Sequence, residues 1–171
     1  MSSVTVCEKA ADTGPWPNDW HEAMKRAVRD PLELCRMLDL PLDWVDSQLD
    51  VEPEFPLFAT REYLSRVERG NPRDPLLLQV LPNRAERQST VGYEVDAVGD
   101  GAAALVPGLL QKYHGRALLV ATGGCAIHCR YCFRREFPYQ ESPPNWSTWD
   151  AAIAELTERD SIEEIILSGG D

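Results

Sequence analysis

Three cysteines within eight residues carry the clearest chemical signal in this 171-residue sequence: Cys125, Cys129 and Cys132. Their Cys-x3-Cys-x2-Cys spacing allows three thiolates to surround one metal centre. Structural zinc prefers four closed ligands, but the nearest fourth candidate, His128, directly precedes Cys129, and adjacent residues rarely point at one metal ion. Iron–sulfur clusters are usually held by four cysteines, so three would leave one iron for a non-protein ligand, as a reaction requires. The spacing favours a reactive iron–sulfur cluster over zinc or three coincidental thiols.

The two other cysteines, Cys7 and Cys35, lie far from this loop in the sequence. The N-terminus has no apolar run long enough for a signal peptide, and no stretch approaches the roughly 20 apolar residues of a membrane span. We therefore predict a cytoplasmic protein, in which thiols stay reduced. In that compartment cysteines are better interpreted as metal ligands or catalysts than as disulfides.

The composition sets broad limits on the class of protein. An apolar content of 43% is enough for a packed core, and 17 basic against 28 acidic residues give a net charge of −11. A nucleic-acid backbone would repel such a chain unless a local basic stripe overrode the average. We expect an acidic protein with neither a nucleic-acid nor a membrane partner.

Two predicted strands and a helix surround the cysteine loop. The apolar run Ala117–Ala121 indicates a buried parallel strand, and Ser147 begins a capping-box pattern that predicts a helix. Ile162 and residues 165–167 indicate a second buried strand, which Ser168-Gly-Gly-Asp171 follows at once. Together they predict one βαβ unit of an α/β fold. Glycines after a strand let the backbone approach a ligand closely.

The N-terminal part predicts short helices. Helical spacing covers residues 19–28, Asp30-Pro31 predicts an N-cap and first turn of a helix to about residue 39, and a third helix is expected over residues 60–68. Residues 71–106 predict a connecting arm with little regular structure. We expect Trp16, Trp20, Trp44 and the helical leucines to be core residues. The predicted domains are residues 1–105 and 106–171.

The cysteine loop, with Tyr131 before its third cysteine, resembles the signature of the radical S-adenosylmethionine (SAM) superfamily. The sequence Ser168-Gly169-Gly170-Asp171 resembles that superfamily's glycine-rich SAM motif. Residues 106–119 and 129–139 resemble the lysine 2,3-aminomutase family. Residues 30–34 and 70–78 resemble the leader of the branch that serves elongation factor P. The resemblance extends from about residue 20 to residue 171 and weakens over residues 83–104. His128, at a variable position, and Ala121-Thr122 depart from the common pattern, without touching a ligand role.

The resemblance implies a partial (β/α) barrel preceded by a helical extension, and an isomerase that converts L-lysine to β-lysine. It implies a 4Fe-4S cluster on the three cysteines, SAM, pyridoxal 5'-phosphate (PLP) and an electron donor. Elongation factor P and its β-lysine ligase are implied as indirect partners. The implied cofactor contacts are SAM at Arg134 (through its carboxylate), Tyr131, Gly169, Gly170 and Asp171, and PLP at Tyr113 and Arg116.

Several of these residues could instead have a purely structural role. Arg134 could be a solvated surface arginine and Tyr131 a core aromatic, while Tyr113 and Arg116 could simply shield a strand. At the level of function, the alternatives are a free-standing catabolic or osmolyte lysine 2,3-aminomutase and a non-catalytic iron–sulfur module. The chain's lysines (Lys9, Lys25 and Lys112) do not match the family's PLP anchor. We therefore expect an N-terminal fragment that is inactive alone.

Overall fold

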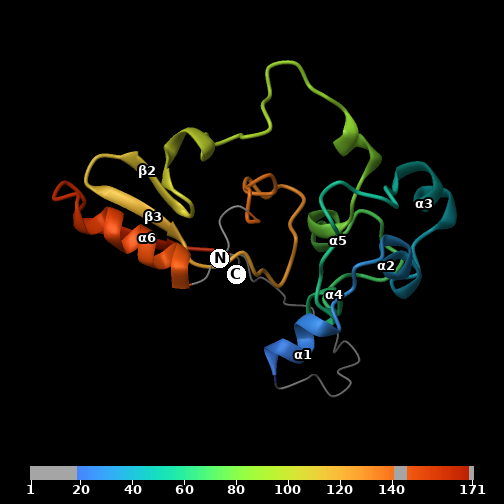
Figure 1. The fold of residues 1–171 in the computed structure, drawn as a ribbon. Helices are drawn as coiled ribbons and strands as arrows, with labels where there is room; N and C mark the ends of the chain where they lie inside the picture. The colour runs from blue at the N-terminus through green and yellow to red at the C-terminus, as the bar shows by residue number, and fades with distance from the viewer. Residues whose placement is uncertain (1–18, 141–145, 170–171) are drawn as a thin grey trace, which may run out of the picture. The chain divides into compact units, whose positions relative to one another are not determined.

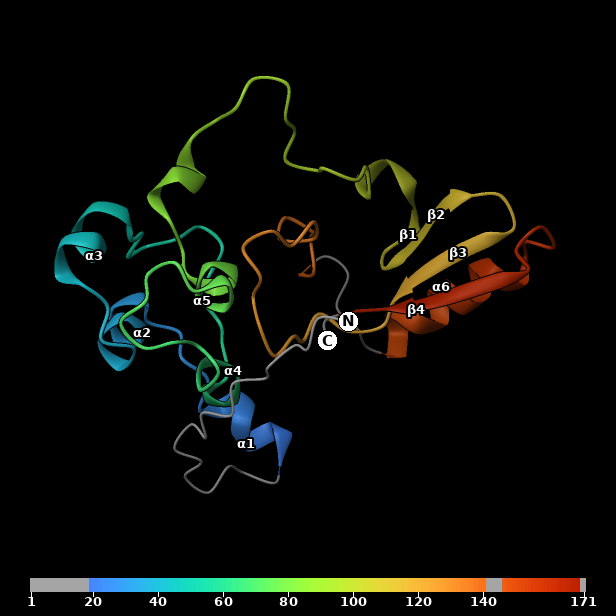
Figure 2. The same ribbon diagram turned by 180° about the vertical axis from the view of Figure 1, so that it is seen from behind.

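The computed structural model describes residues 19–140 and 146–169, which belong to two compact units. Unit 1 comprises the chain up to Glu86 together with the short segment Ile127–Arg130, and unit 2 comprises Arg87–Ala126 and Tyr131–Asp171. Helices build unit 1, and a sheet with one long helix builds unit 2 (Figures 1 and 2). None of the helices in the described part has the length and apolar character needed to cross a membrane.

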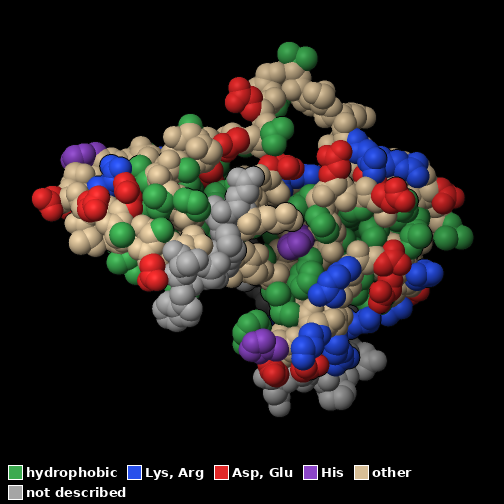
Figure 3. Space-filling view, in the orientation of Figure 1, with side chains coloured by type: hydrophobic (Ala, Val, Ile, Leu, Met, Phe, Trp, Pro, Cys, Tyr) green, Lys and Arg blue, Asp and Glu red, His purple; other side chains and the backbone are tan. Residues whose placement is uncertain are grey.

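Short helices joined by loops make up unit 1. In the described chain they are α1 (Trp20–Lys25), α2 (Pro31–Met37), α3 (Leu42–Gln48), α4 (Arg61–Leu64), α5 (Pro75–Val80) and the 3₁₀ turn η1 (Arg84–Arg87), which runs into unit 2. Acidic and basic side chains are interspersed over these helices on the face shown in Figure 3. Two of the ion pairs are Arg61–Glu33 and Arg69–Asp39, each 2.8 Å long.

A side-chain cap begins α2 where the sequence predicted one, and another begins α4 at the predicted start of the third helix. Asp30 Oδ1 accepts a hydrogen bond from the backbone N–H of Leu32 at 2.9 Å, and Thr60 Oγ1 accepts one from the N–H of Tyr63 at 3.4 Å. Each cap satisfies an N–H group that has no partner within its own helix. The predicted helices are therefore confirmed, although each ends earlier than its periodicity indicated.

Helix α5 corrects the prediction that residues 71–106 form an arm with little regular structure. Asp74 Oδ1 accepts hydrogen bonds from the N–H groups of Leu76 and Leu77, at 2.8 and 3.1 Å, and Pro75 occupies the first helical position. This is the same Asp-Pro start signal that begins α2. The proline-rich composition suggested a loop, but at this position proline starts a helix.

The core of unit 1 consists mainly of aliphatic side chains from residues 28–81. Fully buried members are Val28, Leu34, Leu49, Leu57, Leu64, Leu77 and Val80. Trp44 packs partly against them. The prediction that Trp20 is a core residue is wrong, since 67% of its surface is exposed and α1 has no buried residue. Its ring stacks on His21. Trp16 lies outside the described residues.

Unit 2 holds a four-stranded sheet with the order β1 (Ala104–Val106), β2 (Leu109–Tyr113), β3 (Arg116–Val120), β4 (Glu164–Ser168). The first three strands pair antiparallel, whereas β3 and β4 pair parallel. Helix α6 (Trp146–Thr157) connects the parallel pair, with Ala152 fully buried against Leu109 and Ala117. The predicted βαβ unit is confirmed, and the fold is a mixed α/β fold.

Two features of the sheet differ from the prediction. The hairpin of β2 and β3, which turns at His114-Gly115 with Gly115 at φ +75°, was not predicted. The second parallel strand was expected to be buried, but Ile165 is 48% and Leu167 71% exposed. In the sheet order β4 is an edge strand, so it has only one neighbouring strand to pack beside.

Candidate functional site

The cysteine loop follows β3 directly and lies outside the helices and strands. Cys125, Cys129 and Cys132 are all half-buried and none is in a disulfide. Cys35, by contrast, is buried in the core of unit 1, and burial, followed by the charge of Asp30, raises the pKa of its thiol to about 11. Cys35 therefore lies among core side chains and has the character of a neutral core thiol. Cys7 lies outside the described residues.

Backbone hydrogen bonds make the middle of the loop, Ile127–Arg130, part of unit 1. Ile127 forms an antiparallel bridge with Ala59. The N–H of His128 donates to Phe58 O at 2.7 Å, and the N–H of Arg130 donates to Gln79 O at 2.8 Å. Ile127, His128 and Arg130 are thus bonded to the rest of unit 1, and they hold the backbone on both sides of Cys129. Cys125 and Cys132 belong to unit 2.

The side chain of His128 is also held by unit 1. Its Nδ1 lies 2.9 Å from Pro56 O, and its ring stacks on Phe55, with the ring centroids 5.0 Å apart. Phe58 packs against the same ring with a centroid separation of 5.2 Å. These contacts give His128 a structural role in fixing the loop, which the sequence did not reveal.

Arg130 attaches this segment to Glu86 by an ion pair. Its Nη2 lies 2.5 Å and its Nε 3.0 Å from the two carboxylate oxygens of Glu86, while Nη1 donates to Phe55 O at 2.9 Å. Both charged side chains are largely buried, at 8% and 21% exposed. A two-point arginine–carboxylate pair fixes direction as well as distance, so the position after Cys129 is rigidly set.

Gln79, on α5, contacts the central cysteine itself. Its Nε2 donates a hydrogen bond to Cys129 Sγ at 3.1 Å. Sequence reasoning missed this residue because its helix was predicted to be a connecting arm. The Asp74-Pro75 signal would have found the helix, but not the contact, which spans 50 positions in the sequence.

In unit 2, the buried Arg134 lies in a network of charged and polar groups. It is 7% exposed; its Nη1 donates to Ser168 Oγ at 2.6 Å and its Nε lies 3.3 Å from Asp100 Oδ2. Asp100 Oδ1 is also paired with Lys112 Nζ at 2.6 Å. The alternative that Arg134 is a solvated surface residue is therefore wrong. No spacing signal in the sequence pointed to Asp100.

The glycine motif begins beside this network. Ser168 ends β4, and its carbonyl accepts a hydrogen bond from the N–H of Ala121 at 2.6 Å. A Cβ on Gly169 would lie 2.5 Å from Thr122 Cγ2 and 2.8 Å from Thr122 O. The structure thus gives Gly169 a packing reason to be glycine, in addition to the ligand approach expected from the sequence. Gly170 and Asp171 lie outside the described residues.

The remaining predicted cofactor residues are exposed. Tyr131 is 72% exposed, so the alternative that it is a core aromatic is wrong. Tyr113 and Arg116 are direct partners across the β2–β3 hairpin, and Tyr113 is 70% exposed. Arg116 forms an ion pair with Glu164 on β4. This hairpin therefore places the two side chains next to each other, although sequence alone could not show that they are paired.

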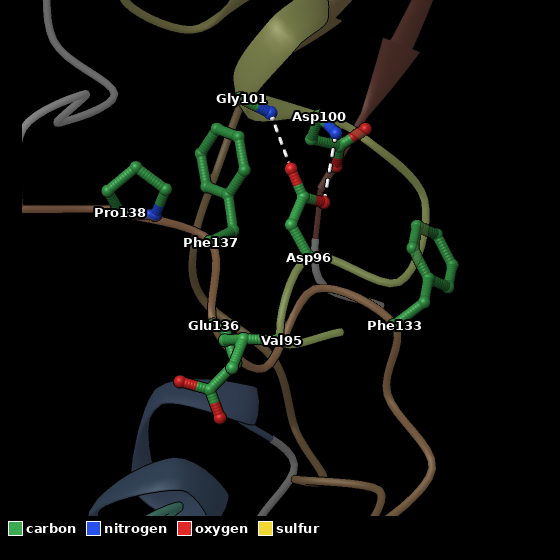
Figure 4. Close-up of a pocket in the computed structure, with 8 residues that line it drawn as sticks. All are labelled: Val95, Asp96, Asp100, Gly101, Phe133, Glu136, Phe137 and Pro138. Atoms are coloured by element: carbon green, nitrogen blue, oxygen red, sulfur yellow. Dashed lines mark hydrogen bonds between the residues drawn. The ribbon is translucent and has the colours of Figure 1, made fainter. Parts of the chain in front are cut away.

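A small pocket adjoins the Arg134 network within unit 2 (Figure 4). Its lining residues are Val95, Asp96, Asp100, Gly101, Phe133, Glu136, Phe137 and Pro138. Asp96 accepts hydrogen bonds from the N–H groups of Gly101 and Asp100, at 2.8 and 3.0 Å, and these bonds lower the pKa of its carboxyl. They fix the turn that carries Asp100.

In the part of the chain that the structure describes, no set of three Cys, His, Asp or Glu side chains comes together as a metal site. The donor chemistry of the loop nevertheless fits an iron–sulfur cluster, because three reduced, half-buried thiols lie within eight residues. Thiolates are the ligands that iron–sulfur clusters take. The buried guanidinium of Arg134, two positions after the last cysteine, is a donor suited to a carboxylate.

No protein-family model matches the chain. It is 40% identical over 153 residues to a protein named L-lysine 2,3-aminomutase of Haemophilus influenzae, covering 90% of this chain and 45% of the relative. For the protein of that name in Escherichia coli the identity is also 40%, over 92% of this chain and 46% of the relative. The protein of that name in Bacillus subtilis is 33% identical over 90% of this chain and 33% of its own length. The chain spans about 45% of the length of the first two relatives.

Proposed function

This chain is a relative of the proteins named L-lysine 2,3-aminomutase, and from that premise we propose that it supplies the cluster- and SAM-binding part of such an isomerase. The observation that carries the proposal is the match to the Haemophilus protein, which leaves 18 of the 171 residues outside. Because the cysteine loop lies 39 residues from the end of the sequence, a continuous match of this length includes it. The activity belongs to the whole protein, which would convert L-lysine to β-lysine.

The cysteine loop would hold the 4Fe-4S cluster through Cys125, Cys129 and Cys132. SAM, when bound, would supply the radical chemistry, and PLP would supply the group on which the amino nitrogen of lysine migrates. The proposed SAM contacts are Arg134, Tyr131, Gly169, Gly170 and Asp171, and the proposed PLP contacts are Tyr113 and Arg116. Three thiols from the chain and a fourth, exchangeable position suit a reactive cluster better than a closed one.

Arg134 is proposed to bind the carboxylate of SAM. Asp100 and Ser168 contact its Nε and Nη1, so the planar guanidinium has a fixed orientation before any ligand arrives. A preoriented arginine loses less conformational freedom when it pairs with a carboxylate. Burial strengthens such a pair because water competes less for its hydrogen bonds.

Arg116 and Tyr113 are proposed to contact the phosphate and ring of PLP from the β2–β3 hairpin. Arg116 is half-exposed and already pairs with Glu164, so a phosphate would have to share this guanidinium with a carboxylate. Such sharing is chemically reasonable, since the guanidinium carries five N–H donors. The hairpin turn at Gly115 holds the two residues opposite each other.

We further propose that the product is used to modify elongation factor P. Support comes from the leader motifs around Asp30 and Gly70, which resemble those of the elongation factor P branch. A β-lysine ligase, an electron donor and a cytoplasmic location follow from this proposal.

The test is an anaerobic assay of the whole protein that carries this chain. We would reconstitute it with iron and sulfide, add SAM, PLP, a reductant and L-lysine, and measure β-lysine by mass spectrometry. The control is the Cys129→Ala variant, which should make none. A cluster that forms without SAM cleavage would instead favour a non-catalytic iron–sulfur module.

A second measurement addresses the use of the product. Deleting the gene in its host should remove the β-lysine mass increment from elongation factor P, and supplying β-lysine to the deletion strain should restore it. An unchanged mass of elongation factor P would favour a free-standing catabolic or osmolyte aminomutase.

A further inference from the structure

We propose that Gln79 is a positioning residue for the cluster, whose amide hydrogen bond to Cys129 Sγ raises the cluster's reduction potential. The inference rests on the proposed function, because it requires Cys129 to be a cluster ligand. It assigns a direct role in the redox chemistry to helix α5 of unit 1.

Gln79 contacts two successive residues of the cysteine loop with different groups. Its side-chain Nε2 donates to Cys129 Sγ at 3.1 Å, and its backbone carbonyl accepts from the N–H of Arg130 at 2.8 Å. The backbone contact with Arg130 aligns the loop. The side-chain amide of Gln79 can therefore donate to the sulfur of Cys129, the residue before Arg130. Substituting the side chain removes only the bond to sulfur and leaves the backbone contact in place.

The helix that carries Gln79 is firmly held. Asp74 caps its first turn, and Leu77 and Val80, on either side of Gln79, are fully buried. The hydroxyl of Tyr63 donates to Leu76 O at 2.8 Å, which ties the same turn to α4. Gln79 itself is only half-buried, so its amide lies at the edge of the core, where it meets the loop.

The loop side of the contact is equally constrained. Arg130 is bound at two points to Glu86, and the ring of His128 stacks on Phe55 and packs at a tilt against Phe58. The residues before and after Cys129 therefore cannot shift without breaking these contacts. A hydrogen bond between two fixed groups acts at a fixed distance, as tuning of a metal site requires.

The chemistry gives the direction of the effect. Hydrogen bonds to the sulfur ligands are one of the factors that set an iron–sulfur cluster's reduction potential. Reduction adds negative charge to the cluster and its thiolates, so an N–H donor stabilises the reduced state more than the oxidised state. The glutamine amide does not ionise, so this influence does not depend on pH.

The experiment is an anaerobic redox titration of the reconstituted whole protein without SAM, in which electron paramagnetic resonance follows the reduced cluster. In Gln79→Leu, which removes the donor, the ratio of reduced to oxidised cluster at a fixed potential should fall about three- to tenfold. This corresponds to a midpoint lower by roughly 30 to 59 mV. Gln79→Met should shift the midpoint in the same direction, because methionine is neutral, has a similar length and also lacks the donor. The control is Gln48→Leu, the same exchange in unit 1 at a residue bonded to Asn83, which should leave the midpoint unchanged.

A normal cluster with an unchanged midpoint in both Gln79 variants would overturn the inference and leave the proposed function standing. Failure of the unsubstituted protein to assemble any cluster would overturn both. Because methionine has nearly the length of glutamine and no charge, Gln79→Met decides the question if Gln79→Leu does not fold, as judged by circular dichroism.

Discussion

Arg134 donates a hydrogen bond to Ser168 Oγ at 2.6 Å, and this bond joins the end of the cysteine loop to the start of the glycine motif. The two residues are 34 positions apart and both belong to unit 2. Asp100 holds the same guanidinium from a third segment of the chain. Arg134, a proposed SAM contact, is thus bonded directly to the first residue of the glycine motif.

Single Cys→Ala substitutions at positions 125, 129 and 132 should each abolish the broad visible absorption of a reconstituted 4Fe-4S cluster, because each removes a thiolate ligand. Cys35→Ala should retain the absorption, since that thiol lies in the core of unit 1. Anaerobic absorption spectra with iron and sulfide analysis make the measurement. A requirement for Cys35 or Cys7 would contradict the assignment of three ligands and an open iron.

Arg134→Lys should weaken SAM binding roughly tenfold to a hundredfold and leave the cluster intact. The lysine keeps a positive charge near Asp100 but loses the planar, two-point donor, and hydrogen bonds to charged groups contribute about 1.5–3 kcal/mol. Titration of the reconstituted protein with SAM measures the effect, and Arg159→Lys, at an exposed residue paired with Glu155, is the control. If Arg134→Lys keeps full SAM affinity but loses affinity for lysine, Arg134 binds the lysine substrate and not SAM.

Gly169→Ala should destabilise unit 2 by about 1–3 kcal/mol, the usual cost of overpacking a tight site. The new Cβ would meet both the side chain and the backbone carbonyl of Thr122. Denaturant unfolding followed by circular dichroism gives the change. Thr122→Ser should rescue it only in part, because the carbonyl contact remains. Gly124→Ala is the matched control, since its Cβ would have an ordinary 3.4 Å contact; equal effects at both glycines would contradict the steric argument.

The Cys35 thiol should make stability fall at high pH. Its pKa is raised from the ordinary value of 9.0 to about 11 in the folded state, so its contribution is fully present below pH 9 and is lost as the pH rises toward 11. The loss is on the order of 2–3 kcal/mol. Guanidinium unfolding at pH 8 and pH 10.5 should show that the free energy of unfolding falls more for the unsubstituted protein than for Cys35→Ala. An equal fall in both proteins would show that Cys35 has the same pKa in the folded and unfolded states.

Features that depend on neighbouring residues could be predicted from the sequence. The Asp30-Pro31 cap, the parallel strands on either side of α6 and the three clustered cysteines follow from local patterns of hydrogen-bonding groups and apolar spacing. Helix α5 carries the same local signal at Asp74-Pro75, but the proline-rich composition around it is typical of a loop.

Contacts between distant segments were decided by the tertiary structure. The bond from Gln79 to Cys129 and the attachment of Arg130 to Glu86 join residues 50 and 44 positions apart. The buried Arg134 pairs with Asp100, which no motif marks. Such contacts depend on how the core brings chain segments together, and the core is specified by all its side chains jointly. A spacing pattern therefore shows which residues have the chemistry, whereas only the packed chain shows which groups those residues touch.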